Sequence, residues 1–420
     1  MRVSIISHRE TSGGAARAAF RLHHSLLRFG VKSRMMVGSK RTDDWTVDGP
    51  SSLVGRAIGL MRPSIGEQFL RLQKTANSNL HSTNILPSRL SSTINNGEAD
   101  VVNLHWVAGE TLSIADIGRI TKPIVWTFHD MWPFCGAEHV TEFGSGARWR
   151  DGYLSQNRPH GDSGLDLDKW TWKRKKNAWK KQMHIICPSR WLAECVRGSS
   201  LMGSWDVNVI PNPLDLEVFK PLDKGFCRNV LNLPLNKKII LFGAIGGDKD
   251  HNKGYDLLIE ALHVLAGRSD QNDVLCCVLG QTQPRVSLGL PFDFQWMGRL
   301  HDDATLSLIY NSADVVLVPS RQENLPQSGT EAQACGCPVV AFDVTGLPDV
   351  VEHRRTGYLA KPYDTEDLAR GIEWVLYSTY SRKRVCVAAR NRAEKYWAID
   401  RVVPQYLDVY KRAYRIGHPH

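Results

Sequence analysis

Two glutamates follow an uninterrupted apolar run in the last third of the chain. Glu323 and Glu331 have seven residues between them, and the run Val315–Val318 comes shortly before. This order predicts a buried strand, a loop that holds Glu323, and a helix that starts near Gly329 and carries Glu331 in its first turn. Amides at a helix N-terminus can bind a diphosphate, and a carboxylate there can accept hydrogen bonds from two neighbouring sugar hydroxyls. Two glutamates at this spacing, taken alone, more often have a structural explanation, in which Glu323 is a solvated loop residue and Glu331 complements the helix dipole.

A glycine-rich segment is a second candidate phosphate site. Gly243-Ala-Ile-Gly246-Gly247 lies between a predicted strand and a predicted helix, and it leads to Lys253-Gly254. Such loops are typical of phosphate binding. The dinucleotide fingerprint G-x-G-x-x-G and the P-loop sequence G-K-[ST] are both absent from it. Lys249 is a candidate for a cation near the phosphates in addition to Lys253. The alternative is that Lys249 is an ordinary exposed lysine.

Together these two segments resemble the retaining glycosyltransferases of family 4. The signature of that family is two glutamates separated by seven residues, and Glu323 and Glu331 have this spacing. The residues that follow, Ala-x-x-x-Gly-x-Pro-Val-Val, also fit the family, as does the loop that ends in Lys253-Gly254. The resemblance implies that Glu323 faces the donor sugar, that Glu331 binds the ribose, and that Lys253 neutralises the departing diphosphate. The family commonly has an arginine shortly after the strand, where this chain has small residues.

Two segments of the N-terminal half are also similar to this family. Gly13-Gly14 stands between a predicted strand and a helix, where the family has a Gly-Gly loop beside the donor phosphates; such turns are common in α/β domains. His129 ends a predicted buried strand within a His-Asp string like that of the polysaccharide-building members, which implies contact with the donor sugar. Many of those members continue with several cysteines, but Cys135 alone follows closely here, so the string does not indicate a metal site.

The resemblance covers nearly the whole chain and implies both its fold and its reaction. The expected fold is α/β, with two Rossmann-like doubly wound domains facing across a cleft, which is the GT-B architecture. The expected reaction is glycosyl transfer with retention at the anomeric carbon, without a cofactor. The expected catalytic residues are Glu323, His129 and Lys253, and the expected donor-binding residues are Gly13, Gly14, Lys253, Leu325, Ser328 and Glu331.

Metal ligands and disulfides are not indicated. The acidic pairs Asp166/Asp168 and Asp248/Asp250 fit the metal-nucleotide motif D-x-D, but matches of three letters arise readily by chance. The nine cysteines lack a disulfide rhythm, so we expect most of them to be small buried residues. We therefore expect transfer to be independent of metal ions.

A basic segment suggests a contact with lipid. Lys169–Met183 contains seven basic residues, three tryptophans and no acidic residue, a composition that suits an anionic membrane surface. Nucleic acid is an alternative partner. A further alternative is that the segment binds no partner and is a solvated helix whose tryptophans pack inward. We expect salt-sensitive vesicle binding that is weakened, without unfolding, when residues 173–176 are neutralised. Val54–Leu72 is a second candidate membrane-facing stretch, because it combines Leu60, Met61, Ile65 and Phe69 with Arg56, Arg62 and Arg71.

Strands and helices alternate in two series, which predicts two parallel sheets. Strands are expected at 2–7, 33–37, 101–105, 124–128 and 185–188, and then at 238–242, 274–279, 295–297, 315–319, 338–342 and 357–360. Helices are expected at 15–29, near Tyr255, Asp303, Gly329 and Thr365, and over 381–414 with a break near Pro404. A proline-dense linker at 210–215 separates the series. We assign an acceptor-binding domain to 1–215, a nucleotide-sugar-binding domain to 216–390, and a C-terminal helix that returns to the first domain to 391–420.

The composition is that of a globular enzyme. The 420 residues include 53 Lys and Arg against 43 Asp and Glu, and the net charge of +10 favours an anionic partner. No apolar run approaches the roughly 18 residues that cross a bilayer, so we expect a cytoplasmic protein, peripheral on the inner membrane. The expected partners are a nucleotide diphosphate sugar and a glycan or lipid-linked glycan acceptor, and not nucleic acid. A nucleotide-sugar epimerase of the same fold and a non-catalytic nucleotide- or polyanion-binding module remain alternatives.

Overall fold

The computed structural model describes residues 1–144, 146–243, 250–268, 271–283, 290–300, 302–377 and 382–417. The chain divides into two compact units. The N-terminal unit comprises Met1–Pro213 together with the chain from Val402 onward, and the C-terminal unit comprises Leu214–Arg401. The division at Pro213 lies inside the segment expected to be a linker.

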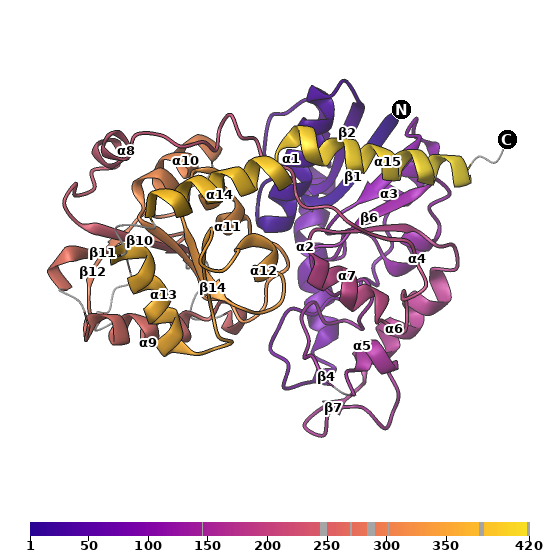
Figure 1. Cartoon of the computed structure of the whole chain (residues 1–420). Coiled ribbons are helices and arrows are strands. Elements are labelled where there is room, and N and C mark those ends of the chain that lie inside the picture. Colours follow the sequence, from indigo (N-terminus) through magenta and orange to yellow (C-terminus); the bar gives the residue numbers. More distant parts are fainter. Residues whose placement is uncertain are drawn as a thin grey trace. The chain divides into compact units, whose positions relative to one another are not determined.

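The N-terminal unit is built on a parallel sheet with helices along it (Figure 1). The strand order is β3-β2-β1-β5-β6-β8-β9, and every pair in it is parallel. The strands are β1 (Arg2–Arg9), β2 (Lys32–Ser39), β3 (Val47–Asp48), β5 (Val101–Leu104), β6 (Ile124–Thr127), β8 (His184–Cys187) and β9 (Val207–Val209). The helices are α1 (Gly14–Arg28), α2 (Leu53–Leu70), α3 (Leu90–Asn96), α4 (Ile114–Gly118), α5 (Arg148–Asp151), α6 (Leu167–Ala178) and α7 (Arg190–Arg197). A small antiparallel pair joins β4 (Gln73–Lys74) to β7 (Ser163–Gly164).

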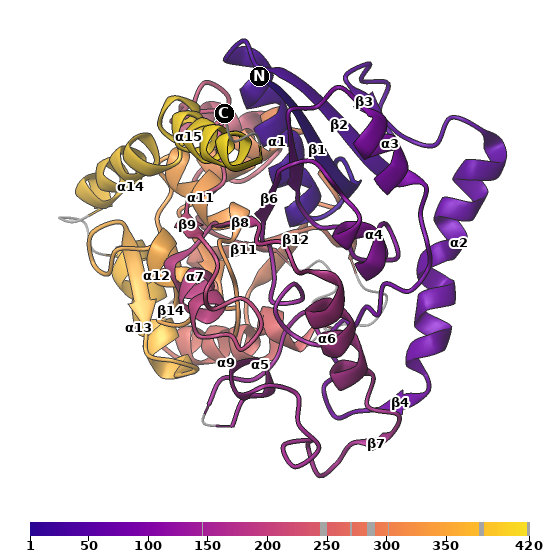
Figure 2. The same cartoon turned by 90° about the vertical axis from the view of Figure 1, so that its right-hand side faces the viewer.

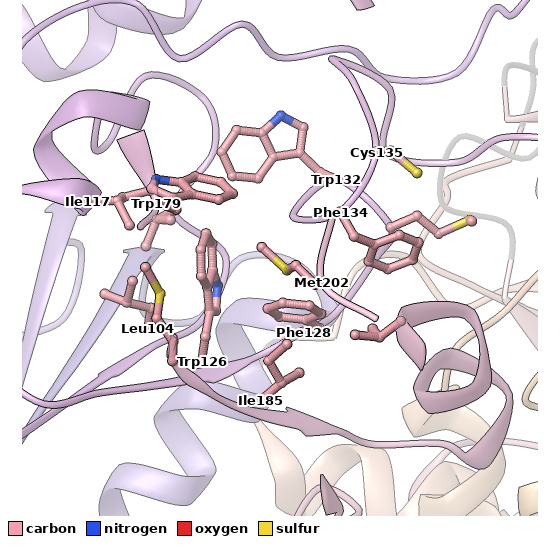
Figure 3. Close-up of a cluster of buried hydrophobic side chains, with 14 of the residues drawn as sticks. Leu104, Ile117, Trp126, Phe128, Trp132, Phe134, Cys135, Trp179, Ile185 and Met202 are labelled. Carbon is pink, nitrogen blue, oxygen red and sulfur yellow. The ribbon is translucent and has the colours of Figure 1, made fainter. Parts of the chain in front are cut away.

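Aromatic side chains fill the core between this sheet and the helices that cover it. Trp126 on β6 packs edge-on against Trp179, with ring centroids 5.2 Å apart, and Trp132 lies close to both rings (Figure 3). The indole nitrogens of these three tryptophans donate to backbone carbonyls, as in the bond from Trp179 Nε1 to Ile114 O at 3.0 Å. These large rings remove much apolar area from water and fix the loops that leave the carboxyl ends of β5 and β6.

The C-terminal unit has a parallel sheet of its own, in the order β12-β11-β10-β13-β14-β15. The strands are β10 (Lys238–Gly243), β11 (Val274–Leu279), β12 (Asp293–Trp296), β13 (Val315–Val318), β14 (Val339–Phe342) and β15 (Gly357–Ala360). The helices are α8 (Lys224–Val230), α9 (Tyr255–Ala266), α10 (Asp303–Ser312), α11 (Gln327–Ala334), α12 (Leu347–Val350), α13 (Thr365–Tyr377) and α14 (Arg382–Tyr396), and the short 3-10 helix η1 is His251–Lys253. Neighbouring residues of β13 lie in separate hydrophobic cores: Val316 belongs to one core and Leu317 to the other. The sheet is therefore covered on both faces, as predicted.

Two helix boundaries differ from the expectation. α11 begins at Gln327 and not near Gly329, because Pro326 is extended and directly precedes the first helical residue. The C-terminal break lies at residues 397–398, between α14 and α15 (Ile399–Gly417), and not at Pro404. Pro404 removes one backbone donor in the second turn of α15, but the helix continues because its apolar side chains, such as Tyr406 and Tyr410, are fully buried.

Further findings concern the cysteines and the membrane. All nine cysteines are free, and eight of them are buried, which confirms the expectation of small buried residues. Among the helices that the structure describes, none is both long and apolar enough to cross a bilayer.

Candidate functional site

The loop after β13 brings Glu323 into direct contact with Lys253. Lys253 Nζ lies 2.5 Å from Glu323 Oε1, and Ser320 Oγ donates to the same oxygen at 3.2 Å. The amide of Glu323 donates to Thr345 Oγ1 at 3.0 Å, which fixes the loop before α12 beside the pair. The Glu323 carboxylate raises the pKa of Lys253, so this lysine stays an ammonium ion. The Lys253 side chain is 44% exposed, so a ligand can reach the pair from solvent.

Gly254 explains why the dipeptide Lys-Gly is needed here. Its φ is +63°, in the left-handed region, and a Cβ at this position would lie 2.0 Å from the carbonyl oxygen of Pro319. The close approach lets the amide of Arg321 donate to Asn252 O at 2.7 Å. Arg321 also holds both carboxylate oxygens of Asp256, at 2.7 and 2.6 Å. These contacts tie η1 and α9 to the loop after β13, and thereby hold Lys253 opposite Glu323.

Glu331 occupies a different environment from Glu323. The sequence predicted that Glu331 lies in the first turn of the helix. Because α11 begins at Gln327, Glu331 lies in the second turn instead. Its side chain is buried and accepts a hydrogen bond from Tyr310 Oη at 2.8 Å. Leu325 is buried in the loop before the helix, and Ser328 is partly exposed at the helix start. Residues 244–249 of the glycine-rich segment, with Lys249, lie outside the described residues.

Gly13 and Gly14 line a cavity in the N-terminal unit. Gly13 has a φ of +94° and forms the turn between β1 and α1. The cavity has a volume of about 330 Å³, and its wall also includes His8, Gly66, Trp106 and Glu110. His8 Nδ1 lies 2.6 Å from Thr111 Oγ1, and burial lowers the pKa of His8 to about 4. The expected Gly-Gly loop is therefore one side of a real cavity rather than an isolated turn.

His129 lies at the carboxyl end of β6 and pairs with a second histidine that the sequence analysis missed. His105 Nδ1 lies 2.9 Å from His129 Nε2, and the rings stack with centroids 5.1 Å apart. Burial lowers the pKa of His129 to about 4 and lowers that of His105 as well, so both rings are neutral near pH 7. His105 directly follows β5 and His129 follows β6, so the position of both histidines at the carboxyl ends of two predicted strands was the signal that could have suggested the pair.

Asp130 links this histidine pair to the cavity wall. Its Oδ2 accepts hydrogen bonds from Trp106 Nε1 at 2.8 Å and from His139 Nδ1 at 2.6 Å. Burial opposes ionisation, but these bonds and the charge of His139 hold the pKa of Asp130 below its usual value. Since Trp106 lines the cavity, the His129-Asp130 segment and the cavity form one connected structure.

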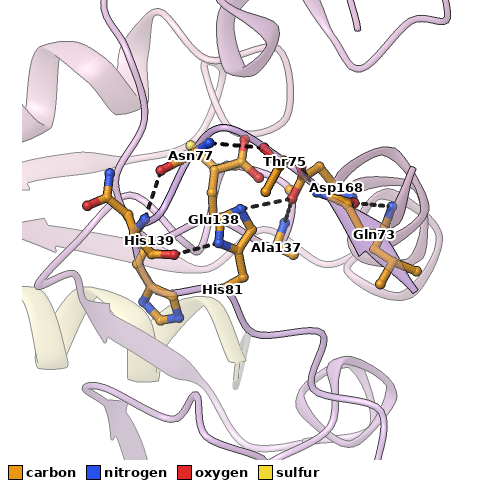
Figure 4. A network of polar contacts seen from close by, with 12 residues as sticks. Gln73, Thr75, Asn77, His81, Ala137, Glu138, His139 and Asp168 are labelled. Atoms are coloured by element: carbon orange, nitrogen blue, oxygen red, sulfur yellow. Dashed lines mark hydrogen bonds and ion pairs between the residues drawn. The ribbon is translucent and has the colours of Figure 1, made fainter. Parts of the chain in front are cut away.

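A polar network in the N-terminal unit includes Asp168, one of the acidic residues that fitted a metal motif (Figure 4). Asp168 accepts hydrogen bonds from Gln73 Nε2 at 2.6 Å and from the amide of Ala137 at 3.2 Å. Asp166 caps α6 and pairs with Arg148 at 2.6 Å. Both aspartates therefore have structural partners. Within the described ranges, no group of three or more His, Cys, Asp or Glu side chains is placed to hold a metal ion.

The basic segment Lys169–Met183 differs from the expected membrane-facing stripe. Trp172 and Trp179 are buried. Lys175 is also fully buried, over the ring of Trp132, and its ammonium donates to the backbone carbonyls of residues 132, 135 and 136. Arg174 donates to the carbonyls of residues 83 and 84 at 2.6 and 2.9 Å. Contrary to that expectation, neutralising residues 173–176 together should destabilise the protein, because buried carbonyls would lose their donors.

Comparisons with known proteins agree with this architecture. Residues 12–218 match the model of Glycosyltransferase Family 4, and residues 223–392 match the model of Glycosyl transferases group 1. A curated relative, the D-inositol 3-phosphate glycosyltransferase of Saccharomonospora viridis, is 31% identical over 226 residues, which are 49% of this chain and 50% of that protein. The chain thus spans about half the length of this curated relative, and 48% of a second, an uncharacterized glycosyltransferase of Methanocaldococcus jannaschii.

Solved structures are similar over the whole chain. A sucrose-phosphate synthase from Thermosynechococcus elongatus has a TM-score of 0.66 at 18% identity, with 99% of both chains covered. Anabaena Alr3699/HepE, solved in complex with UDP-glucose, has a TM-score of 0.66 at 16% identity, with 98% of this chain and 100% of that chain covered. The two family models and the pair of parallel-sheet units lead to one conclusion: the chain belongs to the family-4 glycosyltransferases and has the GT-B fold.

Proposed function

We propose that this protein transfers a hexosyl group from a nucleotide diphosphate sugar to a glycan or lipid-linked glycan acceptor, with retention at the anomeric carbon. The observation that supports this most directly is the ion pair between Glu323, in the loop after β13, and the exposed Lys253 of η1. Similar structures were solved with UDP and with UDP-glucose, and another similar protein, WaaG, is described as a glycosyltransferase involved in lipopolysaccharide biosynthesis. We accordingly place the reaction in the synthesis of cell-surface polysaccharide or lipopolysaccharide.

The pair suits a reaction in which negative charge develops on a departing diphosphate. Lys253 is held as an ammonium ion, and a diphosphate that approaches it competes with the carboxylate of Glu323. As the glycosidic bond breaks, charge on the phosphate oxygens grows and its attraction to Lys253 strengthens, which lowers the barrier. Glu323, released from the lysine, can then accept hydrogen bonds from the hydroxyls of the donor sugar.

The remaining residues have roles that follow from their positions. Glu331 binds the ribose hydroxyls, with its carboxylate oriented by Tyr310. Leu325 and Ser328 form the donor pocket at the start of α11. Gly13 and Gly14 offer backbone amides at the start of α1. His129, a neutral imidazole, can donate or accept one hydrogen bond to the donor sugar.

A lipid-linked acceptor would require contact with a membrane, and α6 together with the residues that follow it still offers positive charge for it. Lys173, Lys176, Lys180 and Lys181 are exposed, although the rest of the segment Lys169–Met183 is largely anchored in the unit. We propose that these four lysines add electrostatic attraction to the cytoplasmic face of the inner membrane, at about 1 kcal/mol for each residue near the surface.

A transfer assay with the full chain and a panel of nucleotide sugars tests the function. We expect product only when an acceptor is present, with unchanged anomeric configuration by NMR, and loss of turnover in Glu323→Gln. Glu217→Gln, an exposed glutamate in the same unit, is the matched control and should keep wild-type activity. Conversion of the donor sugar without an acceptor would show an epimerase. Nucleotide binding without turnover, unchanged in Glu323→Gln, would show a binding module.

A further inference from the structure

Helix α2 has the reverse of the usual amphipathic arrangement. Three of its glycines face the protein, whereas six large apolar residues face outward. The residues of α2 that are not exposed lie on one side of the helix and are Gly55, Gly59, Arg62, Pro63, Gly66, Phe69 and Leu70. Glycine recurs there at the spacing of successive helical turns. Surface helices ordinarily bury their leucines and methionines and expose polar residues.

The inward face is fixed by close contacts. A Cβ at Gly66 would lie 2.9 Å from Cγ of Glu110, and a Cβ at Gly59 would lie 3.0 Å from the carbonyl oxygen of Gly38. Arg62 points the same way and donates to three carbonyls, those of Glu110 and Leu86 at 2.7 Å and of Pro87 at 2.9 Å. The helix therefore cannot rotate to bury its large apolar side chains, because those side chains would replace glycines at these contacts.

The outward face is a large exposed apolar surface. Its exposed fractions range from 46% to 79% over six large side chains, Leu53, Val54, Ile58, Leu60, Met61 and Ile65. Figure 2 shows α2 along the edge of the unit, with β4 following at its end. Trp170 of α6 is 39% exposed and packs against Phe69, which extends this surface toward the lysines of α6. Contiguous exposed apolar surface of this kind marks a docking site.

Charge identifies the occupant. Arg56 on α2 and Arg71 and Lys74 just beyond it are exposed, whereas Glu67 is the acidic residue of the helix and lines the cavity. A symmetric dimer through this face would bring the same cations of two copies together. An apolar face flanked by cations instead matches an anionic lipid interface, with acyl chains for the leucines and headgroups for the arginines.

We propose that the outward face of α2 is a membrane-binding surface that inserts its apolar side chains into an anionic bilayer. This inference goes beyond the proposed function, because it does not depend on any transfer reaction. Pro63, Gly66, Glu67 and Leu70 of the same helix line the cavity that contains Gly13 and Gly14. A membrane bound to α2 would therefore be separated from that cavity by about one helix diameter, roughly 10 Å.

Vesicle flotation of the full chain tests the proposal. We expect wild-type protein to float with vesicles of phosphatidylglycerol and phosphatidylcholine, and the triple variant Leu60→Gln, Met61→Gln, Ile65→Gln to bind about tenfold more weakly. Phe226→Gln, Val230→Gln, Leu235→Gln is the matched control, since it changes three exposed apolar residues of the C-terminal unit, and it should bind as wild type. Arg56→Gln, Arg71→Gln, Lys74→Gln should weaken binding and flatten its salt dependence. Unchanged thermal unfolding would show that each variant is folded.

Three outcomes would overturn the proposal. The first is wild-type protein that stays unbound at low salt. The second is an α2 variant that floats like wild type while neutralisation of Lys173, Lys176, Lys180 and Lys181 abolishes binding, which would assign the contact to α6. The third is a wild-type dimer in sedimentation that the α2 variant converts to monomer without any vesicle binding, which would assign the surface to a second copy of the chain.

Discussion

The sequence motif does not distinguish Glu323 from Glu331, but in the structure their carboxylates have different partners. Glu323 faces an exposed ammonium ion, whereas Glu331 is buried against a tyrosine hydroxyl. We therefore predict that Glu331→Ala mainly weakens donor binding and that Glu323→Ala mainly lowers kcat. Loss of a charge-assisted hydrogen bond should cost about 1.5–3 kcal/mol, roughly 10- to 150-fold in the affected constant.

Steady-state kinetics with the cognate donor measures this difference. Tyr310→Phe is the control for Glu331, because it keeps the aromatic ring and removes only the hydroxyl that orients the carboxylate. Its effect should be smaller than that of Glu331→Ala. Wild-type kinetics in both glutamate variants would refute the assignment of this site.

Acid sensitivity should follow from the buried histidines. Burial lowers the pKa of His129 and of His8 from 6.5 to about 4. Between these values the unfolded chain binds protons that the folded protein does not, so stability should fall as the pH drops from 6.5 to 4. Each histidine should contribute on the order of 1–3 kcal/mol over that range. Urea unfolding at several pH values measures this decline. A pH dependence that remains as steep in His129→Asn would contradict the role of His129.

Individual site residues were predictable where a motif carries them, but their partners were not. Glu323 and Lys253 stand in recognisable strings, and the structure pairs them. Tyr310, Thr345 and His105 come from other helices and loops, and only the order and register of the strands bring them to the site. A single sequence does not contain that register in any local pattern.

At the scale of elements, α6 shows why composition misleads when periodicity is ignored. Asp168, Thr171, Trp172, Lys175 and Trp179 recur at helical spacing, and all of them are buried. Counting charges over the segment suggested a membrane stripe, whereas the helical period places Lys175 on the tryptophan side. Strands were easier to predict, because continuous apolar runs such as that of β13 are buried on both faces. The short edge strands β3 and β9 lack such runs and were missed.

Lys175 should be essential to the stability of the loop that follows β6. Its ammonium donates to three carbonyls of that loop, and burial lowers its pKa. We predict that Lys175→Met lowers the free energy of unfolding by about 3–5 kcal/mol, because the buried carbonyls lose their donor. Lys173→Met, at an exposed position of the same helix, should stay within about 0.5 kcal/mol of wild type. Urea unfolding of both variants measures this, and equal values would contradict the structural role of Lys175.

At the scale of the whole molecule, the two parallel sheets could be predicted from the two alternating series of strands and helices, because each series has its own apolar runs. The positions of the last helices could not be derived in the same way. α15 begins in the C-terminal unit and continues into the N-terminal unit, where Tyr410 Oη accepts from Asn103 Nδ2 at 2.7 Å and Arg412 pairs with Asp206 at 2.9 Å. These contacts join residues about 200 to 300 positions apart in the chain and leave no local signal.

Nucleotide binding should stabilise the full chain, and it should do so without a divalent cation. In the proposed site Lys253 supplies the positive charge for the diphosphate, and the aspartates of the motif at 166–168 are already engaged with Arg148 and Gln73. At a ligand concentration of about 100 times Kd, binding adds about 2.7 kcal/mol to the free energy of unfolding. We predict that the cognate nucleoside diphosphate raises Tm equally with and without excess chelator, that Lys253→Met abolishes the rise, and that transfer persists in chelator. Thermal unfolding and the transfer assay measure these effects, and loss on chelation that manganese or magnesium restores would instead show a metal-dependent enzyme.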